Sequence, residues 1–123
     1  SMPTTELTPA EMADRTGVTV DTLRYYEKEG LLTGVGRAAS GHRRYDQDDV
    51  LWVQVLRCLR MTGMTIEQLR RYCDLGEQGE PTKSERRRIL VEHRQEVVAK
   101  VAELESALAL IDEKLAHYEG VAE

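Results

Sequence analysis

The fold is decided by residues 82–118, TKSERRRILVEHRQEVVAKVAELESALALIDEKLAHY, which contain no Pro or Gly. After a first step of seven, the apolar residues recur in alternating steps of four and three. This spacing is typical of the a and d positions of a coiled coil. The sequence therefore predicts one long dimerisation helix over 82–118, followed by a short tail at 119–123. The residues expected to form the dimer seam are Leu90, Val97, Val101, Leu104, Leu108, Ile111 and Leu115, with Tyr118 at its end.

The composition leaves room for one small domain in front of this helix. The chain has 123 residues, no Phe and a charged fraction of 32%. A second independent core would need more chain than that. The net charge of −5 is uneven, because residues 1–72 hold ten basic and ten acidic side chains while the remainder holds seven and twelve. An acidic total argues against a protein covered with nucleic acid, but it leaves open a local basic face.

The chain has no apolar run long enough to span a membrane, and no signal peptide is visible. A cytoplasmic protein with no membrane partner is therefore expected.

Two short helices are predicted within the first 30 residues. Thr8 and Glu11 match a capping box at the start of the first helix, and Gly17 marks its end. Thr19 is expected to cap a second helix over about 20–29. Two short helices joined by a turn that contains glycine are the outline of a helix-turn-helix motif.

The next segment, about 31–45, is rich in glycine and reads as a small hairpin, or wing. It carries the cationic side chains Arg37, His42, Arg43 and Arg44, which form the basic patch that the net charge conceals. A pair of helices within 47–75 follows, opened by caps at Asp46 and Thr65. The prediction is thus a mainly α protein with a winged helix-turn-helix domain at 1–75, a linker at 76–81 and the dimerisation helix.

Five motifs in this order resemble the MerR-type transcriptional regulators: TGV at 16–18, TLRYYE at 22–27, GLL at 30–32, SGHRRY at 40–45 and DDV at 48–50. The resemblance implies a homodimer with a winged helix-turn-helix head and an antiparallel coiled coil. It also implies binding to double-stranded promoter DNA at a palindrome within an overlong spacer. Activation would follow from distortion of that spacer, so that RNA polymerase reads both promoter elements.

Charge and the resemblance together select the expected DNA-binding residues. Those on the second helix are taken to contact phosphates or base edges, and those on the wing to contact the backbone or the minor groove. The alternatives are a solvated helix face and a mobile charged loop. The role of Asp21 stays open between a contact to cytosine and a favourable interaction with the helix N-terminus. The expected set is Thr19, Thr22, Arg24, Tyr25, Tyr26, Arg37, His42, Arg43 and Arg44.

Cys58 is the candidate sensor. The stretch around it is most similar to the branch of the family that responds to aldehydes and nitrosative stress, and Arg57 and Arg60 flank it. Cations near a thiol favour the nucleophilic thiolate. The alternative is a small buried hydrophobic residue, with another effector for the protein. Cys73 is interpreted as structural or incidental.

Metal sensing and catalysis are not expected. The metal-sensing branches place cysteines at the start of the long helix and in a terminal loop behind it, whereas no cysteine follows Cys73. No cofactor or metal site is therefore predicted. An enzyme would need a nucleophile and base pair, a phosphate loop or a metal quartet, and the sequence offers none of these. A pure coiled-coil adaptor would leave the arginines of the wing unexplained.

Overall fold

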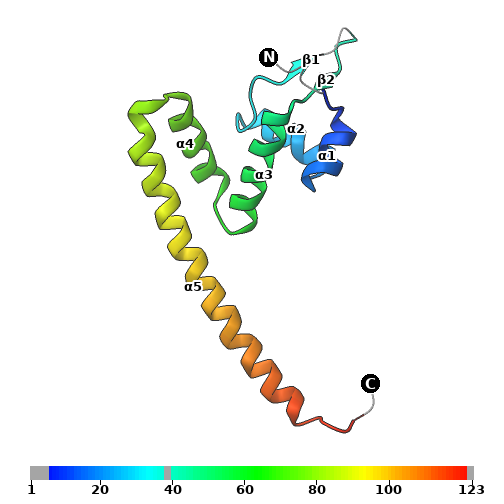
Figure 1. Ribbon diagram of the computed structural model, residues 1–123, viewed down its shortest axis with the longest axis vertical. Coiled ribbons are helices and arrows are strands. Elements are labelled where there is room, and N and C mark those ends of the chain that lie inside the picture. Colours follow the sequence, from blue (N-terminus) through cyan, green and yellow to red (C-terminus); the bar gives the residue numbers. More distant parts are fainter. Residues whose placement is uncertain (1–5, 38–39, 122–123) are drawn as a thin grey trace. The chain divides into compact units, whose positions relative to one another are not determined.

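The structure is a computed structural model that describes residues 6–37 and 40–121. It divides into two compact units, one ending at Arg86 and the other beginning at Arg87. The first unit is built from α1 (Pro9–Thr16), α2 (Val20–Lys28), β1 (Gly36–Arg37), β2 (Arg43–Arg44), α3 (Gln47–Met61), α4 (Ile66–Glu77) and the 3-10 helix η1 (Glu80–Thr82). The helix α5 (Lys83–Ala116) starts in the first unit and continues through the second (Figure 1).

Local caps set the ends of the first two helices. The Thr8 hydroxyl accepts a hydrogen bond from the Glu11 amide while the Glu11 carboxylate accepts one from the Thr8 amide, as the capping box predicts. Gly17 then ends α1 at φ 78°, a left-handed conformation that a residue without a Cβ adopts at little cost. Thr19 caps α2 through the amide of Thr22. The predicted helix-turn-helix is confirmed.

The wing is a small antiparallel hairpin in which Gly36 is opposite Arg44 and Arg37 is opposite Arg43. Its base is held by a further antiparallel bridge that the sequence did not reveal. The Leu7 amide donates to the Tyr45 carbonyl at 2.7 Å, and the Tyr45 amide donates to the Leu7 carbonyl at 2.9 Å. The segment before α1 and the end of the wing are therefore joined.

The core of the first unit lies where α1 packs on α2 and α3, and where α3 packs on α4 (Figure 1). One stripe of α3 is buried, as its spacing predicts for an amphipathic helix. Trp52 of the same helix stays partly exposed, and its indole N–H donates to the Leu31 carbonyl at 2.7 Å. The buried apolar residues of the unit include Met12, Leu23, Leu31, Leu32, Tyr45, Val50, Val53, Leu56, Leu59, Met64 and Leu69.

The predicted linker at 76–81 was partly wrong. Helix α4 continues through Gly76 to Glu77, and η1 occupies the second half of the segment. Thr82, the first residue of the predicted long helix, lies in η1 instead. Its hydroxyl contacts the Leu75 carbonyl and, at 2.9 Å, the Gly79 carbonyl. The turn between α4 and α5 is thus closed by hydrogen bonds rather than left as a free connection.

Helix α5 covers the predicted dimerisation segment but ends at Ala116, two residues before Tyr118. Seam residues from Val101 onward are largely exposed within the single chain, with Leu104 at 69%. An exposed apolar seam of this length on one helix is typical of a coiled-coil strand that pairs with another chain. Within the described ranges, no helix is long and apolar enough to cross a membrane.

Candidate DNA-binding surface

Helix α2 presents two different faces. Leu23 and Tyr26 are buried and hold the helix on the core. Arg24 and Tyr25 point the other way, with 61% of the Arg24 side chain and 42% of Tyr25 exposed. Tyr26 is only 4% exposed, so its ring is a core group beside the exposed Tyr25 ring. An exposed guanidinium and an exposed phenol side by side are suited to phosphate contacts.

The N-terminus of α2 is arranged by two threonines. The Thr19 hydroxyl accepts from the Thr22 amide at 3.0 Å and lies 2.9 Å from the Thr22 hydroxyl. Asp21, one turn from Arg24, lies 3.8 Å from its guanidinium at the surface. The carboxylate therefore lies next to a cation of the same helix face, which offsets part of its repulsion from a phosphate.

Arg43 joins the wing to α2. Its Nε lies 2.5 Å from Oε2 of Glu27, and both side chains are partly buried. An ion pair partly shielded from solvent is screened less than a surface pair but costs desolvation, so its main consequence is that loss of either partner leaves the other charge uncompensated. Among the predicted contacts, Arg43 therefore has a positioning role that the sequence did not reveal.

The other cations of the wing are distributed around this pair. His42 is exposed, and its Nδ1 lies 2.8 Å from the Ser40 hydroxyl. Arg44 is half-buried and close enough to Glu11 to contribute to the lowered pKa of that carboxyl, after the hydrogen bonds from Thr8. Arg37 belongs to β1, but its side chain lies outside the described part of the structure.

Tyr45 is buried near the Glu27–Arg43 pair, close enough for both charges to act on its pKa. The residue is 1% exposed, and its buried hydroxyl has no hydrogen-bond partner among the described residues. Burial raises the pKa of Tyr45, and the nearby Glu27 carboxylate raises it further. The phenol therefore stays protonated and neutral under ordinary conditions.

Cys58 is exposed on α3. It shares a side of the helix with Leu51 and Val55, which are 63% and 40% exposed, and Met61 is exposed at the end of the same helix. The sequence left open a buried, purely structural thiol, and the single chain does not bury it. Cys73, in contrast, is buried, and burial together with Asp74 and Glu77 raises its pKa to about 11.

The two arginines that flank Cys58 are engaged with other groups. Neighbouring positions on a helix point in different directions. The Arg57 guanidinium lies against the helix-turn-helix turn, 3.4 Å from the place a Cβ would occupy at Gly17. The Arg60 Nη1 donates to the Met64 carbonyl at 3.3 Å. In the folded chain Arg57 thus lies near the turn at Gly17, and Arg60 bonds to the loop that follows α3.

The described residues contain no cluster of three or more His, Cys, Asp or Glu side chains that could hold a metal ion. The candidate DNA-binding surface is instead the exposed face of α2 together with the basic wing. A short helix after a tight turn, flanked by a cationic hairpin, defines a winged helix-turn-helix DNA-binding protein.

Comparison with known proteins identifies the family. Residues 7–75 match the model of the MerR HTH family regulatory proteins, and residues 50–116 match the MerR DNA-binding model. The chain belongs to the MerR family and is a DNA-binding transcriptional regulator.

Relatives place it in a particular branch of that family. It is 38% identical to an uncharacterised HTH-type transcriptional regulator of Haemophilus influenzae, over 91% of this chain and 83% of the relative. It is 40% identical to the regulator AdhR of Bacillus subtilis, over 72% of this chain and 64% of AdhR. The crystal structure of HiNmlR, a MerR family regulator lacking the sensor domain and bound to promoter DNA, superposes with a TM-score of 0.86 at 36% identity, covering 94% and 91% of the two chains. The predicted similarity to the AdhR and NmlR branch is confirmed.

Proposed function

We propose that the chain acts as a homodimer on a palindromic promoter, with one head on each half-site. The single observation that carries this proposal is the exposed pair Arg24 and Tyr25 on α2, beside the cationic wing. The exposed seam of α5 supports the dimer, because apolar positions at coiled-coil spacing gain free energy when a second helix covers them. The HiNmlR complex with promoter DNA supports double-stranded DNA as the partner.

The dimer activates transcription by deforming an overlong promoter spacer. Two heads joined by an antiparallel coiled coil have a set separation, so the DNA must bend or twist to meet both. Such deformation costs free energy that the phosphate contacts offset. RNA polymerase then finds the two promoter elements in a usable arrangement.

The effector is a reactive aldehyde or a related electrophile that modifies Cys58. The similarity to AdhR and the exposure of Cys58 support this assignment. The thiolate sulfur attacks the carbonyl carbon and forms an S–C bond, while the π electrons of the carbonyl move to oxygen, which takes a proton from water. The adduct adds a polar hydroxyl to the apolar side of α3 that carries Leu51 and Val55. It shifts the balance between two head arrangements by its differential stability in them.

A second candidate keeps DNA binding but gives Cys58 no sensing role. The observation that favours it is the hydrogen bond from Arg60 Nη1 to the Met64 carbonyl, which uses one donor of a cation that the sequence places near the thiol. The protein would then respond to a different effector or act as a repressor.

The experiment that tests the proposal measures induction of a reporter driven by the DNA upstream of the gene. Cells receive formaldehyde, and wild type is compared with Cys58→Ser and with the matched control Cys73→Ser. We expect Cys58→Ser to lose induction while its purified protein binds the promoter within about twofold of wild type. Cys73→Ser should keep induction. Full induction of Cys58→Ser would favour the second candidate.

A further inference from the structure

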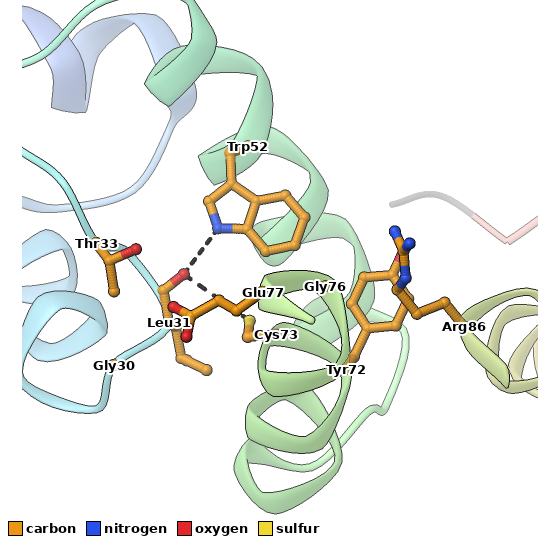
Figure 2. A pocket seen from close by; sticks show the side chains of 9 residues that line it. All are labelled: Gly30, Leu31, Thr33, Trp52, Tyr72, Cys73, Gly76, Glu77 and Arg86. Atoms are coloured by element: carbon orange, nitrogen blue, oxygen red, sulfur yellow. Dashed lines mark hydrogen bonds between the residues drawn. The ribbon is translucent and has the colours of Figure 1, made fainter. Parts of the chain in front are cut away.

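A cavity of about 270 Å³ lies in the first unit (Figure 2). Its walls come from the segment that follows α2, from α3, from α4 and from the start of α5. Three of its side chains, Leu31, Trp52 and Tyr72, are apolar or aromatic, and of its two charged residues Glu77 is exposed while Arg86 is half-buried. The lining residues are Gly30, Leu31, Thr33, Trp52, Tyr72, Cys73, Gly76, Glu77 and Arg86.

We propose that this cavity binds a small flat aromatic molecule that carries one N–H or O–H donor. The aromatic part of the argument rests on Trp52 and Tyr72. Their rings are nearly parallel, with an interplanar angle of 16° and centroids 6.2 Å apart, and both side chains keep part of their surface exposed. Partly exposed aromatic faces gain free energy when another ring covers them.

The floor of the cavity offers no strong hydrogen-bonding group. The Leu31 carbonyl already accepts from the Trp52 indole N–H at 2.7 Å, and the Cys73 thiol lies 3.9 Å from it (Figure 2). The Cys73 thiol is neutral, because burial disfavours its charged form. An apolar ring edge therefore fits the floor better than a charged or strongly polar group.

The charged residues of the cavity lining favour a ligand that carries a hydrogen-bond donor. Glu77 is exposed on α4 at the cavity lining, so its carboxylate is available as an acceptor. The one cation of the lining, Arg86, donates through Nε to the Thr82 hydroxyl at 3.1 Å and through Nη2 to the Gly79 carbonyl at 3.0 Å. Much of its donor capacity is thus used by the turn between α4 and α5. An anionic ligand would meet an acid without a free cation opposite it.

Gly76 keeps the entrance open. Glycine inside a helix costs about 1 kcal/mol relative to alanine, so its presence needs a reason. Glycine is usually required where φ is positive or where there is no room for a Cβ. Neither reason applies to Gly76, which is not among the glycines with positive φ and whose added Cβ would meet no atom within 4 Å. A side chain at this position would instead project into open space next to the cavity lining.

The test uses the full-length protein with phenol as the probe. Trp52 is the only tryptophan of the chain, so its indole N–H gives a single assignable NMR signal in the cavity wall. We expect phenol to shift this signal in a saturable way with a Kd in the millimolar range, as the small size of the probe dictates. Benzoate should bind at least tenfold more weakly. If phenol causes no saturable shift of this signal, the proposal is overturned. The same conclusion holds if the reason is that a partner chain covers the cavity.

Variants of the two lining residues Gly76 and Glu77 make the test specific. Gly76→Leu should weaken phenol binding more than tenfold while raising the melting temperature, because leucine is the better helix former. Gly76→Ala should bind within threefold of wild type. Glu77→Gln should weaken binding about threefold or more, and the matched control Glu67→Gln on the same helix should leave it unchanged. Wild-type binding by both Gly76→Leu and Glu77→Gln would place phenol elsewhere and overturn the proposal.

Discussion

Arg43 on the wing and Glu27 on α2 form an ion pair with Nε and Oε2 2.5 Å apart, so the wing and α2 are joined by a partly buried contact. Both residues lie within the motifs that resemble the family, but each was interpreted separately in the sequence. The pair explains why a two-stranded hairpin, which is marginal alone, can hold a stable position beside α2.

Glu27→Gln should destabilise the head and weaken DNA binding. The substitution leaves the partly buried Arg43 guanidinium without its counter-charge, which we expect to cost about 1–3 kcal/mol. Urea denaturation measures the loss. Asp21→Asn is the matched control, because its pair with Arg24 is surface-exposed and worth less than about 1 kcal/mol. Equal stability of Glu27→Gln and Asp21→Asn would contradict the positioning role of the pair.

Leu108→Asp should dissociate the proposed dimer. A carboxylate in an apolar coiled-coil seam is desolvated without a partner, so pairing becomes unfavourable by several kcal/mol. Sedimentation velocity at micromolar concentration should give a dimer for wild type and a monomer for the variant. Ser106→Asp, on the same exposed helix but outside the seam, should stay dimeric. A wild-type monomer, or a dimeric Leu108→Asp, would refute the assignment of the seam.

Tyr45→Phe should not destabilise the protein. The Tyr45 hydroxyl is buried without a hydrogen-bond partner among the described residues, so its removal relieves a desolvation cost. We expect a free energy of unfolding between that of wild type and about 1 kcal/mol above it. The same urea denaturation detects the change. A loss of more than 1 kcal/mol would mean that the hydroxyl makes a contact essential to the fold.

The free energy of unfolding should fall as the pH rises into the alkaline range. Burial raises the pKa of Cys73 from 9.0 to about 11, and it also raises the pKa of Tyr26. A raised pKa in the folded state contributes stability that is present below the unfolded value and lost as pH rises through the folded value. For Cys73 the window is therefore pH 9 to 11, and the contribution is on the order of 2 kcal/mol. Cys73→Ala should show a shallower loss of unfolding free energy across this window, and an unchanged slope would contradict the cause given.

The helix starts were predictable because their signals are local. Thr8, Thr19, Asp46 and Thr65 each accept from a backbone amide three residues later, as their spacing predicts. The seam of α5 is also visible in the sequence, because its period of three and four is a local property. The end of α4 was missed because glycine usually stops a helix, whereas Gly76 continues one.

The sequence predicts which residues lie at the candidate site, but not which of them contact one another. The exposed positions of Arg24 and Tyr25 follow from the burial of Leu23 and Tyr26 on the opposite face. The Glu27–Arg43 pair joins residues sixteen positions apart, and the bridge between Leu7 and Tyr45 joins residues still further apart. Sequence spacing carries no direct signal for such contacts, and only the folded hairpin reveals them.

The most direct test of the central claim measures the affinity of the protein for the DNA upstream of its gene at a series of salt concentrations. We expect specific binding to a duplex that contains an inverted repeat, and the logarithm of the association constant should fall linearly with the logarithm of the salt concentration. Arg24→Gln should weaken binding and reduce the magnitude of the slope by about one. Arg94→Gln, an exposed arginine on α5, should leave both unchanged. Salt-independent binding, or equal affinity for the repeat and a scrambled duplex, would contradict the account.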